Sequence, residues 1–350
     1  MLIRSLFDKY LVNAGRLTIA ALLIGTALCH PAHAQITFLG ATQLVDNVAN
    51  QGSPTLTLLL DQQLLMYYVN HSNNTIYVDF ELSGKPESTG IVVNSQELTD
   101  VGAAPIDPGT GGILISYVLP NQQLAFAYSS NGVNFGAPVT PSNASLGLID
   151  TTPDWQHVPA LASVGASGYP VYVATTGTNG LVYMSYTLDG VHFTPLTSGP
   201  VSTYTAVSRP SLTIYGYNGN PWVGFTTGSN RVAIVGDATT NDIGWDTGNV
   251  YWGNSNRNGN YAGIALVSSG RGCVGNACTL YVFGQDTASS QQLKSIHSAG
   301  GTSQWSAATD VGNQMRWTPS LSYGVGNYFD TLYLVYPDDG NTNISWRYDY

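Results

Sequence analysis

Short apolar runs separated by polar turns recur along the chain at a nearly constant spacing. The runs are rich in β-branched and aromatic residues and are bounded by Gly, Asn, Asp and Pro, which is typical of β-strands. Six of them occupy residues 64–69, 113–118, 170–175, 221–226, 280–285 and 332–337. A polar turn and a further run follow several of these, as at 75–80, 124–129 and 181–186. The pattern predicts an all-β protein.

A short motif of proline, a small residue, leucine and a small residue or threonine precedes these runs. Clear copies begin at Pro54, Pro159, Pro210 and Pro319, with weaker copies at Pro105 and Ile264, and successive copies lie 51 to 55 residues apart. Six repeats of about four strands at this period predict a six-bladed β-propeller. A two-sheet sandwich would not explain the even spacing.

The two ends of the chain are expected to complete one blade together. In several repeats a fourth strand begins with a hydrophobic-x-aromatic triplet, at 133–135, 191–193, 243–245 and 303–305. The last repeat ends at 345–350 without such a strand, while residues 36–38 supply a similar triplet near the N-terminus. We therefore expect residues near 36–46 to form the outer strand of the final blade, which closes the propeller and holds both termini.

Residues 1–34 have the features of a signal peptide. Arg4, Lys9 and Arg16 precede or flank an apolar stretch at 17–29, and Ala-His-Ala at 32–34 provides small residues for cleavage. A transmembrane anchor is the weaker interpretation, because the apolar stretch is too short to cross about 30 Å of hydrocarbon. The expected mature protein is a single propeller domain at 35–350, secreted or periplasmic, with no membrane span.

Charged residues make up 9% of the chain, against about 25% in an average soluble domain, and the formal net charge is −10. Plentiful large apolar residues exclude a disordered chain. A nucleic-acid partner is not expected, because no basic face is available.

Two cysteines remain after removal of the signal peptide, and in an oxidising compartment Cys273 and Cys278 are expected to form a disulfide that closes a small loop. Half of a metal site is the alternative, but no second Cys or His cluster has matching spacing. An oxygen-rich segment at 338–343 lacks the order of an EF-hand loop. No metal site and no cofactor are predicted.

Two turn sequences, SSNGVNF at 129–135 and TLDGVHF at 187–193, resemble the Asp-box of the sialidase-like propellers, whose pattern is Ser-x-Asp-x-Gly-x-x-Trp. In such a turn the Asp or Asn side chain accepts hydrogen bonds from backbone amides, glycine takes a left-handed conformation, and the aromatic residue packs between strands. The resemblance implies the propeller fold and a structural role for these turns.

The resemblance also implies where sialidase chemistry would reside: three arginines that hold the substrate carboxylate, a Tyr nucleophile assisted by Glu, and an Asp acid/base. The residues two before each repeat motif contain no arginine: Gly52, Ala103, His157, Ser208, Ala262 and Trp317. All three glutamates fall in the first repeat, at Glu81, Glu87 and Glu97. A sialidase mechanism is therefore not expected.

Loops that enter the innermost strands, and those that join second and third strands, are expected to share one face around a central channel. The loop residues expected on this face are Asp107, Asp154, Trp155, His157, Arg209, Trp252, Arg257, Tyr261, Arg316 and Trp317. The ligand contacts predicted among them are Trp155, His157, Arg209, Arg316 and Trp317, because an aromatic ring stacks on a sugar while polar neighbours bond its hydroxyl groups. In the alternative, the aromatic residues pack between blades and the arginines bond loop carbonyls.

Three functions follow from these residues. The favoured one is a secreted, lectin-like protein whose partner is a glycan or polysaccharide. The second is a glycoside hydrolase with a non-sialidase constellation, in which Asp107 and Asp154 would form the carboxylate pair and His157 is a further catalytic candidate. The third is a non-catalytic extracellular scaffold for protein contacts.

Overall fold

The computed structural model describes the chain in segments: residues 39–45, 53–59, 63–95, 100–107, 111–165, 167–215, 220–228, 231–236, 245–251, 263–268, 279–286, 292–299, 309–314, 319–323, 332–337 and 344–349. All of them belong to the compact unit Thr37–Tyr350. The expected signal peptide and the expected disulfide between Cys273 and Cys278 lie outside the described residues. Within the described segments, no helix is both long and apolar enough to cross a membrane.

The described strands form six small antiparallel sheets, which we number as blades in chain order. Blade 1 contains β2 (Thr55–Leu58), β3 (Leu64–Asn70), β4 (Thr75–Phe80) and β5 (Glu87–Val92). Blade 2 contains β6 (Gly102–Pro105), β7 (Ile113–Val118) and β8 (Leu124–Ser129). Blade 3 contains β9 (Ala160–Ser163), β10 (Val171–Thr176), β11 (Val182–Thr187) and β12 (Phe193–Pro195), and a short 3-10 helix (Ala144–Leu146) precedes it.

The second half of the chain repeats the arrangement. Blade 4 contains β13 (Ser211–Tyr215), β14 (Asn220–Thr226), β15 (Arg231–Gly236) and β16 (Trp245–Tyr251). Blade 5 contains β17 (Ile264–Ser268), β18 (Thr279–Asp286), β19 (Gln292–Ala299) and β20 (Thr309–Gln314). Blade 6 contains β21 (Ser320–Tyr323), β22 (Leu332–Pro337), β23 (Ile344–Asp349) and, from the other end of the chain, β1 (Leu39–Val45).

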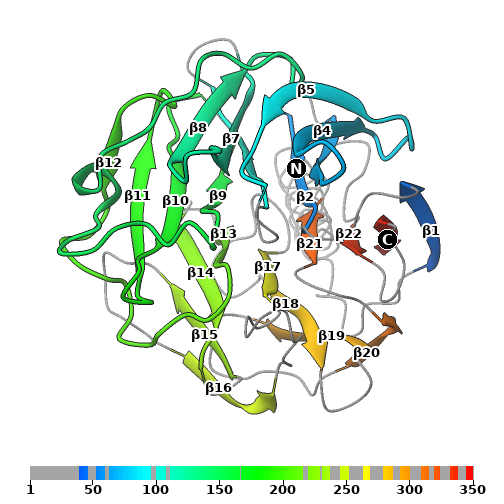
Figure 1. Ribbon diagram of the computed structural model, residues 1–350. Helices are drawn as coiled ribbons and strands as arrows, with labels where there is room; N and C mark the ends of the chain where they lie inside the picture. The colour runs from blue at the N-terminus through cyan, green and yellow to red at the C-terminus, as the bar shows by residue number, and fades with distance from the viewer. Residues whose placement is uncertain are drawn as a thin grey trace, which may run out of the picture. The chain divides into compact units, whose positions relative to one another are not determined.

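The first strand of each blade is its inner strand, and the six inner strands form a closed ring. Each inner strand contacts the next in chain order, from β2 through β6, β9, β13 and β17 to β21, and β21 contacts β2. The blades follow one another around this ring (Figure 1). The fold is a six-bladed β-propeller, as the repeat spacing predicted.

The final blade is completed by the N-terminal strand, as predicted from the ends of the sequence. Strand β1 pairs antiparallel with β23, with Thr42 opposite Trp346 and Val45 opposite Ile344. This pairing gives blade 6 the sheet order β1-β23-β22-β21. Because the outer strand comes from residues about 300 positions away, both ends of the described chain are tied to the same sheet.

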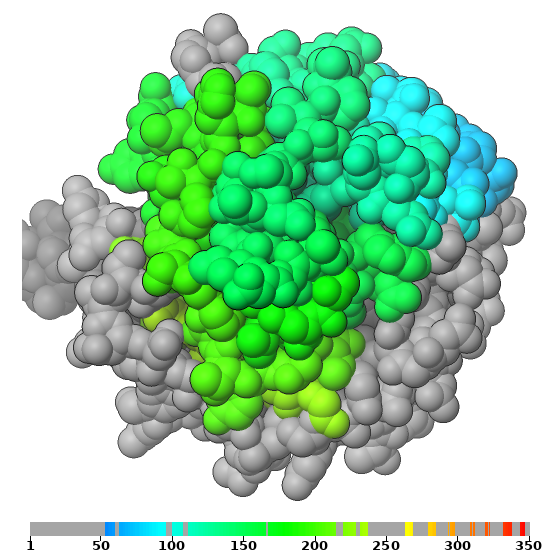
Figure 2. Space-filling model, turned by 60° about the vertical axis from the view of Figure 1, so that its left-hand side comes forward, coloured from blue at the N-terminus to red at the C-terminus, as the bar shows by residue number. Residues whose placement is uncertain are grey.

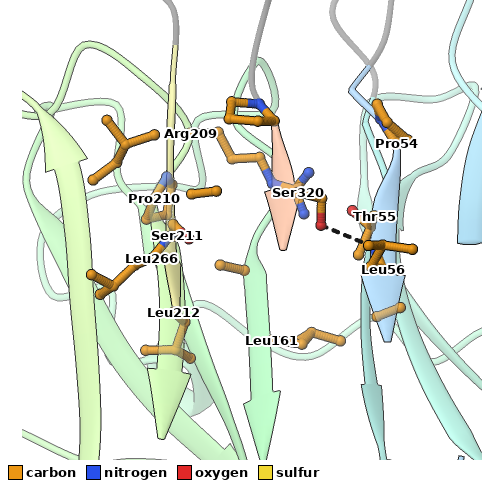
Figure 3. A pocket seen from close by; sticks show the side chains of 15 residues that line it. Pro54, Thr55, Leu56, Leu161, Arg209, Pro210, Ser211, Leu212, Leu266 and Ser320 are labelled. Carbon is orange, nitrogen blue, oxygen red and sulfur yellow. Dashed lines mark hydrogen bonds between the residues drawn. The ribbon is translucent and has the colours of Figure 1, made fainter. Parts of the chain in front are cut away.

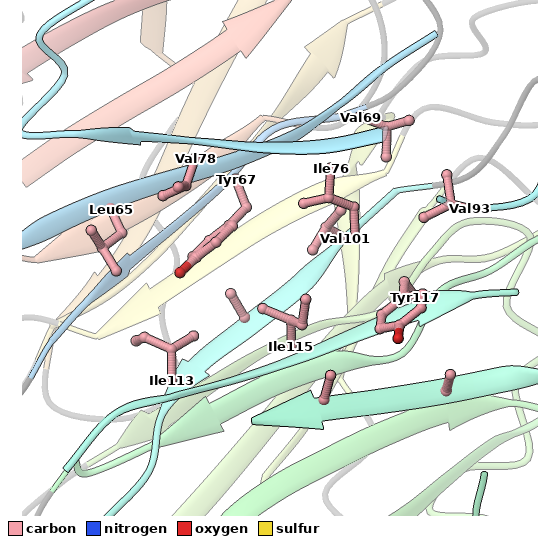
Figure 4. Close-up of a cluster of buried hydrophobic side chains, with 13 residues drawn as sticks. Leu65, Tyr67, Val69, Ile76, Val78, Val93, Val101, Ile113, Ile115 and Tyr117 are labelled. Atoms are coloured by element: carbon pink, nitrogen blue, oxygen red, sulfur yellow. The ribbon is translucent and has the colours of Figure 1, made fainter. Parts of the chain in front are cut away.

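The core lies between successive blades, and the strands in the middle of a blade are apolar on both faces. Alternate side chains of a strand point to opposite faces of its sheet. In β3, Leu65 and Tyr67 face blade 2, where they join a cluster with Ile113 and Ile115 (Figure 4). The intervening Met66 faces the other way and packs with residues of blade 6. Burial on both sides explains why these strands appear as continuous apolar runs in the sequence.

Blade 2 departs from the predicted repeat at both of its edges. Its inner strand is Gly102–Pro105, so Val101 occupies the position that proline holds in blades 1, 3, 4 and 6, and the repeat motif placed at Pro105 is a misassignment. Its expected fourth strand is reduced to an isolated bridge between Phe126 and Val139. Prolines on both sides of this segment, Pro138 and Pro141, lack the N–H groups that a longer ladder needs.

The turns that resemble an Asp-box have the local geometry expected of them. The Asn131 Oδ1 atom accepts hydrogen bonds from the backbone N–H groups two and three residues later, at 3.1 and 2.9 Å. The Asp189 Oδ1 atom does the same, at 2.8 Å for both. Gly132 and Gly190 have φ angles of 77° and 75°, in the left-handed region that favours glycine. The Tyr67 hydroxyl of blade 1 donates to the Gly132 carbonyl, which ties this turn to the neighbouring blade.

Candidate functional site

The inner strands begin close together at one end of the propeller. The Ser53 N–H, just before β2, donates to the Asp100 carboxylate at 2.6 Å, and the Thr55 hydroxyl donates to the Val101 carbonyl. The Ser116 hydroxyl of β7 donates to the Pro159 carbonyl, just before β9, at 2.8 Å. We call the residues immediately before and at the starts of β2, β6, β9, β13, β17 and β21 the channel entrance.

The described part of the channel encloses a cavity of about 80 Å³. All six inner strands contribute to its lining and run in the same direction around it (Figure 3). Small-molecule sites are typically about 300–1,000 Å³, so this cavity has room for a few waters and not for a sugar ring. A sugar therefore does not fit in this described cavity.

Arg209, predicted as a ligand contact, is engaged inside the protein. It lies two residues before the first residue of β13 in blade 4, and its Nη2 atom donates to the Val101 carbonyl of blade 2 at 2.8 Å. Its Nη1 atom lies 3.8 Å from the Asp100 Oδ2 atom, and the Arg209 side chain is 11% exposed. Burial lowers the pKa of the guanidinium, and the neighbouring Asp100 carboxylate opposes that shift. Arg209 therefore joins two blades that are not neighbours, as the alternative interpretation of the arginines expected.

The close approach of the Pro159 carbonyl and the Ser116 hydroxyl requires glycine at position 102. A Cβ atom there would lie 2.4 Å from the Pro159 carbonyl oxygen, 2.2 Å from the Ser116 Oγ atom and 3.4 Å from the Arg209 Nη2 atom. The first of these contacts is with backbone, which cannot move aside as a side chain can. Gly102 is thus needed for its small size at this point.

Hydroxyl groups in the repeat motif join neighbouring blades, a role that sequence reasoning missed. The Ser320 Oγ atom of β21 accepts a hydrogen bond from the Leu56 N–H of β2 at 2.9 Å (Figure 3). The Ser211 Oγ atom of β13 accepts one from the Leu266 N–H of β17, also at 2.9 Å. The sequence feature that could have indicated these bonds is the Ser or Thr that directly follows proline in three copies of the motif, at Thr55, Ser211 and Ser320.

Asp154 and His157 form an ordered pair in the loop that precedes β9. The His157 Nδ1 atom lies 2.9 Å from the Asp154 Oδ2 atom, and the Gln156 N–H donates to Asp154 Oδ1 at 3.1 Å. Burial by itself would raise the pKa of Asp154, but the hydrogen bond and charge of His157, with the Gln156 N–H, hold it below its ordinary value. Because an ionised carboxylate only accepts hydrogen bonds, His157 is the donor.

Trp155 lies between these two residues in the chain and is half-buried. The side chains of Asp154 and His157 are 24% and 11% exposed. The loop thus presents a partly exposed aromatic ring next to a polar pair whose geometry is already held in place. Of the predicted ligand contacts, the structure brings Trp155 and His157 together in one loop.

Asp107 does not belong to this loop set, which corrects the sequence-based placement. It follows β6 in the connection to β7, where its Oδ1 atom accepts a hydrogen bond from the Gly111 N–H at 2.8 Å. Asp154 instead precedes β9. Because the inner strands run in the same direction, the two carboxylates lie at opposite ends of them, and they cannot act as a pair on one glycosidic bond.

Several predicted site residues lie outside the described residues: Trp252, Arg257, Tyr261, Arg316, Trp317 and the oxygen-rich segment 338–343. Their roles stay predictions. Among the residues that are described, no group of three or more His, Cys, Asp or Glu side chains is arranged to hold a metal ion.

No protein-family model matches the sequence, and neither does any curated protein sequence. Solved structures match the fold at low identity. AofleA from Arthrobotrys oligospora is 10% identical, with 92% of this chain and 89% of that chain covered and a TM-score of 0.61. A Penicillium chrysogenum α-L-arabinanase complexed with arabinobiose is 14% identical, with 89% of this chain and 98% of that chain covered and a TM-score of 0.59. The fucose-recognising, six-bladed Aleuria aurantia lectin is 12% identical, with 89% of this chain and 93% of that chain covered and a TM-score of 0.56. These likenesses show the six-bladed propeller fold and do not show membership of the sialidase-like propellers.

Proposed function

We propose that this protein is a carbohydrate-binding propeller, and that the loop carrying Asp154, Trp155 and His157 contacts the sugar. The observation that carries the proposal is the half-buried Trp155 beside an ordered polar pair in the loop that precedes β9. An aromatic face stacks on the apolar face of a pyranose, and a fixed polar pair can bond its hydroxyl groups. The cavity among the described inner strands is too small for a sugar ring.

The affinity expected from such a loop is weak to moderate. Stacking on one aromatic ring and each neutral hydrogen bond contribute on the order of 1 kcal/mol net. The fold supports the proposal without deciding it, since the Aleuria aurantia lectin and the arabinanase share it. The placement of Asp107 and Asp154 at opposite ends of the inner strands removes the carboxylate pair on which the hydrolase interpretation relied.

A glycan array probed with the purified mature protein tests the function. Trp155→Ala should abolish or strongly weaken binding while the melting temperature changes by only a few degrees, because Trp155 is only half-buried and is not among the residues of the described inter-blade clusters. The matched control is Tyr169→Ala: Tyr169 is 49% exposed and lies in the β9–β10 connection, at the other end of blade 3. No binding of the wild-type protein to any glycan would refute the proposed function.

We also propose that the protein is exported, with cleavage after Ala34 and a disulfide between Cys273 and Cys278. Support comes from the basic and apolar N-terminal sequence and from the pair of cysteines that remains. Mass spectrometry of the protein from a bacterial periplasm or culture medium should show an N-terminus at Gln35. Both cysteines should react with an alkylating reagent only after reduction, and free thiols in the exported protein would contradict the disulfide.

A further inference from the structure

The end of blade 3 that carries Trp155 is widened by loops on both sides of the β10–β11 turn. On one side the Asp154 N–H donates to the Thr176 carbonyl at 2.8 Å, which extends the sheet beyond β9. On the other side the Val201 N–H donates to the Val182 carbonyl at 2.9 Å, and the Ala206 N–H to the Gly180 carbonyl at 2.8 Å. We call residues 151–157, 176–182 and 201–206 the blade-3 rim.

Four backbone segments therefore lie side by side in the rim. Neighbouring strands are about 4.8 Å apart, so three intervals give a width of roughly 14 Å. Blade 3 lies between blades 2 and 4, and its residues, in green, occupy the front of the molecule in Figure 2. The rim is wider than one sugar ring.

An aromatic side chain stands on each of the two flanking loops. Trp155 is half-buried on the loop before β9, and Tyr204 is 39% exposed on the loop before β13. The Tyr204 N–H is held by the Ser202 Oγ atom at 3.0 Å, which orders this part of the loop. Tyr204 meets the criterion that singled out Trp155, a position in a loop that enters an inner strand, but sequence analysis did not select it.

Neutral polar groups fill the space between the two aromatic residues. Thr178 and Asn179 are exposed at the tip of the β10–β11 turn. The Thr178 hydroxyl lies 3.1 Å from the Thr151 hydroxyl, and the Asn179 amide donates to the Tyr183 hydroxyl at 2.8 Å. These groups are held in place and keep further donors and acceptors for a ligand.

The charge of the rim selects the class of ligand. Residues 151–157, 176–182 and 201–206 contain no Lys or Arg, and their one acid is Asp154. The Asp154 carboxylate is already bonded by His157 and by the Gln156 N–H. A uronic or sialic acid would find no Lys or Arg within the rim to pair with its carboxylate, and the one His there, His157, already bonds Asp154. A neutral sugar needs no such partner.

We propose that the blade-3 rim binds a neutral oligosaccharide of more than one ring, with one ring stacked on Trp155 and another near Tyr204. This inference rests on the proposed carbohydrate-binding function and names its ligand class. Binding by two aromatic platforms on one rigid sheet end makes affinity depend on chain length. The contacts between the platforms come from the hydroxyl and amide groups of Thr178 and Asn179.

The test is a calorimetric titration with linear oligosaccharides of defined length. The probes are gluco- and manno-oligosaccharides of one, two, four and six rings, with oligogalacturonates of four and six rings as the acidic set. At least one neutral series should bind, with affinity rising tenfold or more between one and four rings, and the acidic set should bind at least tenfold more weakly. Tyr204→Ala should lower the affinity for four rings about tenfold and leave binding of one ring unchanged, whereas Trp155→Ala should weaken both.

The outcomes separate this inference from the proposed function. A protein that binds glycans on the array but none of these neutral probes, or binds the acidic set equally well, keeps the function and overturns the inference. Equal affinity of Tyr204→Ala and the wild type for four rings also overturns it. Tyr169→Ala serves as the control for loss of an exposed tyrosine, and thermal melts of all variants exclude unfolding as the cause.

Discussion

The channel entrance and the blade-3 rim are both polar, but they use their polar groups differently. At the channel entrance the guanidinium of Arg209, the carboxylate of Asp100 and the hydroxyl of Ser320 all bond groups in other blades. In the rim the Asp154 carboxylate bonds only its own loop, and the ring of Trp155 remains partly exposed.

The difference teaches that a position just before an inner strand does not define a ligand contact. Arg209 and His157 occupy nearly equivalent positions in their repeats. The Arg209 side chain bonds the start of another blade, whereas the His157 side chain, equally buried, bonds only Asp154 of its own loop. That loop leaves Asp154 and Trp155 partly exposed. Stability should therefore depend on the first region and ligand binding on the second, with little overlap.

The largest effect on stability is expected from Arg209→Ala. The substitution removes a positive charge 3.8 Å from the Asp100 carboxylate, which is 14% exposed, and removes the donor to the Val101 carbonyl. Removing one partner of a largely buried pair typically costs about 3 kcal/mol, and urea unfolding should show a loss of that order in the free energy of unfolding. Trp155→Ala, measured in the same way, should cost much less.

A double-mutant cycle with Asp100→Ala isolates the pair from the lost volume of the arginine side chain. The two substitutions should be clearly non-additive. A stable Arg209→Ala protein that has lost glycan binding would break the comparison and return Arg209 to the ligand site, as the sequence suggested.

A smaller effect is expected from Ser320→Ala. The Ser320 hydroxyl accepts the Leu56 N–H across the junction of blades 6 and 1, so its loss leaves a buried amide donor unpaired at a cost of about 1 to 2 kcal/mol. Ser130→Ala, at an exposed turn, is the matched control and should change stability by less than about 0.5 kcal/mol. Equal losses in the two variants would show that the hydroxyl does not join the blades.

Much of the fold could be predicted because the repeat is strongly marked. Proline at 54, 159, 210 and 319 locates four inner strands to the residue, and the missing fourth strand at the C-terminus predicts the role of β1. The start of the inner strand of blade 2 could not be predicted, because Val101 stands where the motif has proline. The nearest proline, Pro105, is the last residue of that strand. The wrong position of the motif does not explain why Asp107 was placed on the wrong face. Asp107 comes after the first residue of the motif whether the motif begins at Val101 or at Pro105.

The site was less predictable because its contacts join residues far apart in the sequence. Ser320 and Leu56 are separated by 264 positions, and Arg209 and Val101 by 108. No local pattern distinguishes a hydroxyl that bonds the next blade from one that faces solvent. Trp155 and His157 could be selected from their place before an inner strand, but the exposure that makes Tyr204 a candidate depends on how its loop packs.

A weak dependence of stability on pH is expected from the rim. The pKa of Asp154 in the folded protein lies below its ordinary value of 3.8, so its ionised form stabilises the fold above that value. The contribution is lost as the pH falls through the lowered pKa. Asp154→Asn should therefore be less stable than the wild type near pH 7, by up to about 1 kcal/mol, and the difference should shrink in acid.

Asp189→Asn provides the comparison for this experiment. The Asp189 carboxylate also pairs with a histidine, His192, and its pKa is also lowered, but its side chain is 43% exposed against 24% for Asp154. Solvent screening reduces the contribution of such a pair. A larger pH-dependent loss in Asp189→Asn than in Asp154→Asn would show that exposure does not govern the two pairs.

The smallest effect is expected from Thr176→Val, and it tests whether bonding across blades, and not polarity alone, is what stabilises the channel. The Thr176 hydroxyl is fully buried and has no hydrogen-bond partner among the described residues, whereas the Thr55 hydroxyl bonds the Val101 carbonyl of the next blade. Valine has nearly the shape of threonine, so Thr176→Val should be neutral or slightly stabilising, while Thr55→Val should cost about 1 kcal/mol. Chemical denaturation of the two variants measures both changes. If they lost the same free energy, the bond from Thr55 to blade 2 would not be the reason for a hydroxyl there, and the distinction between the two regions would have to rest on Arg209 alone.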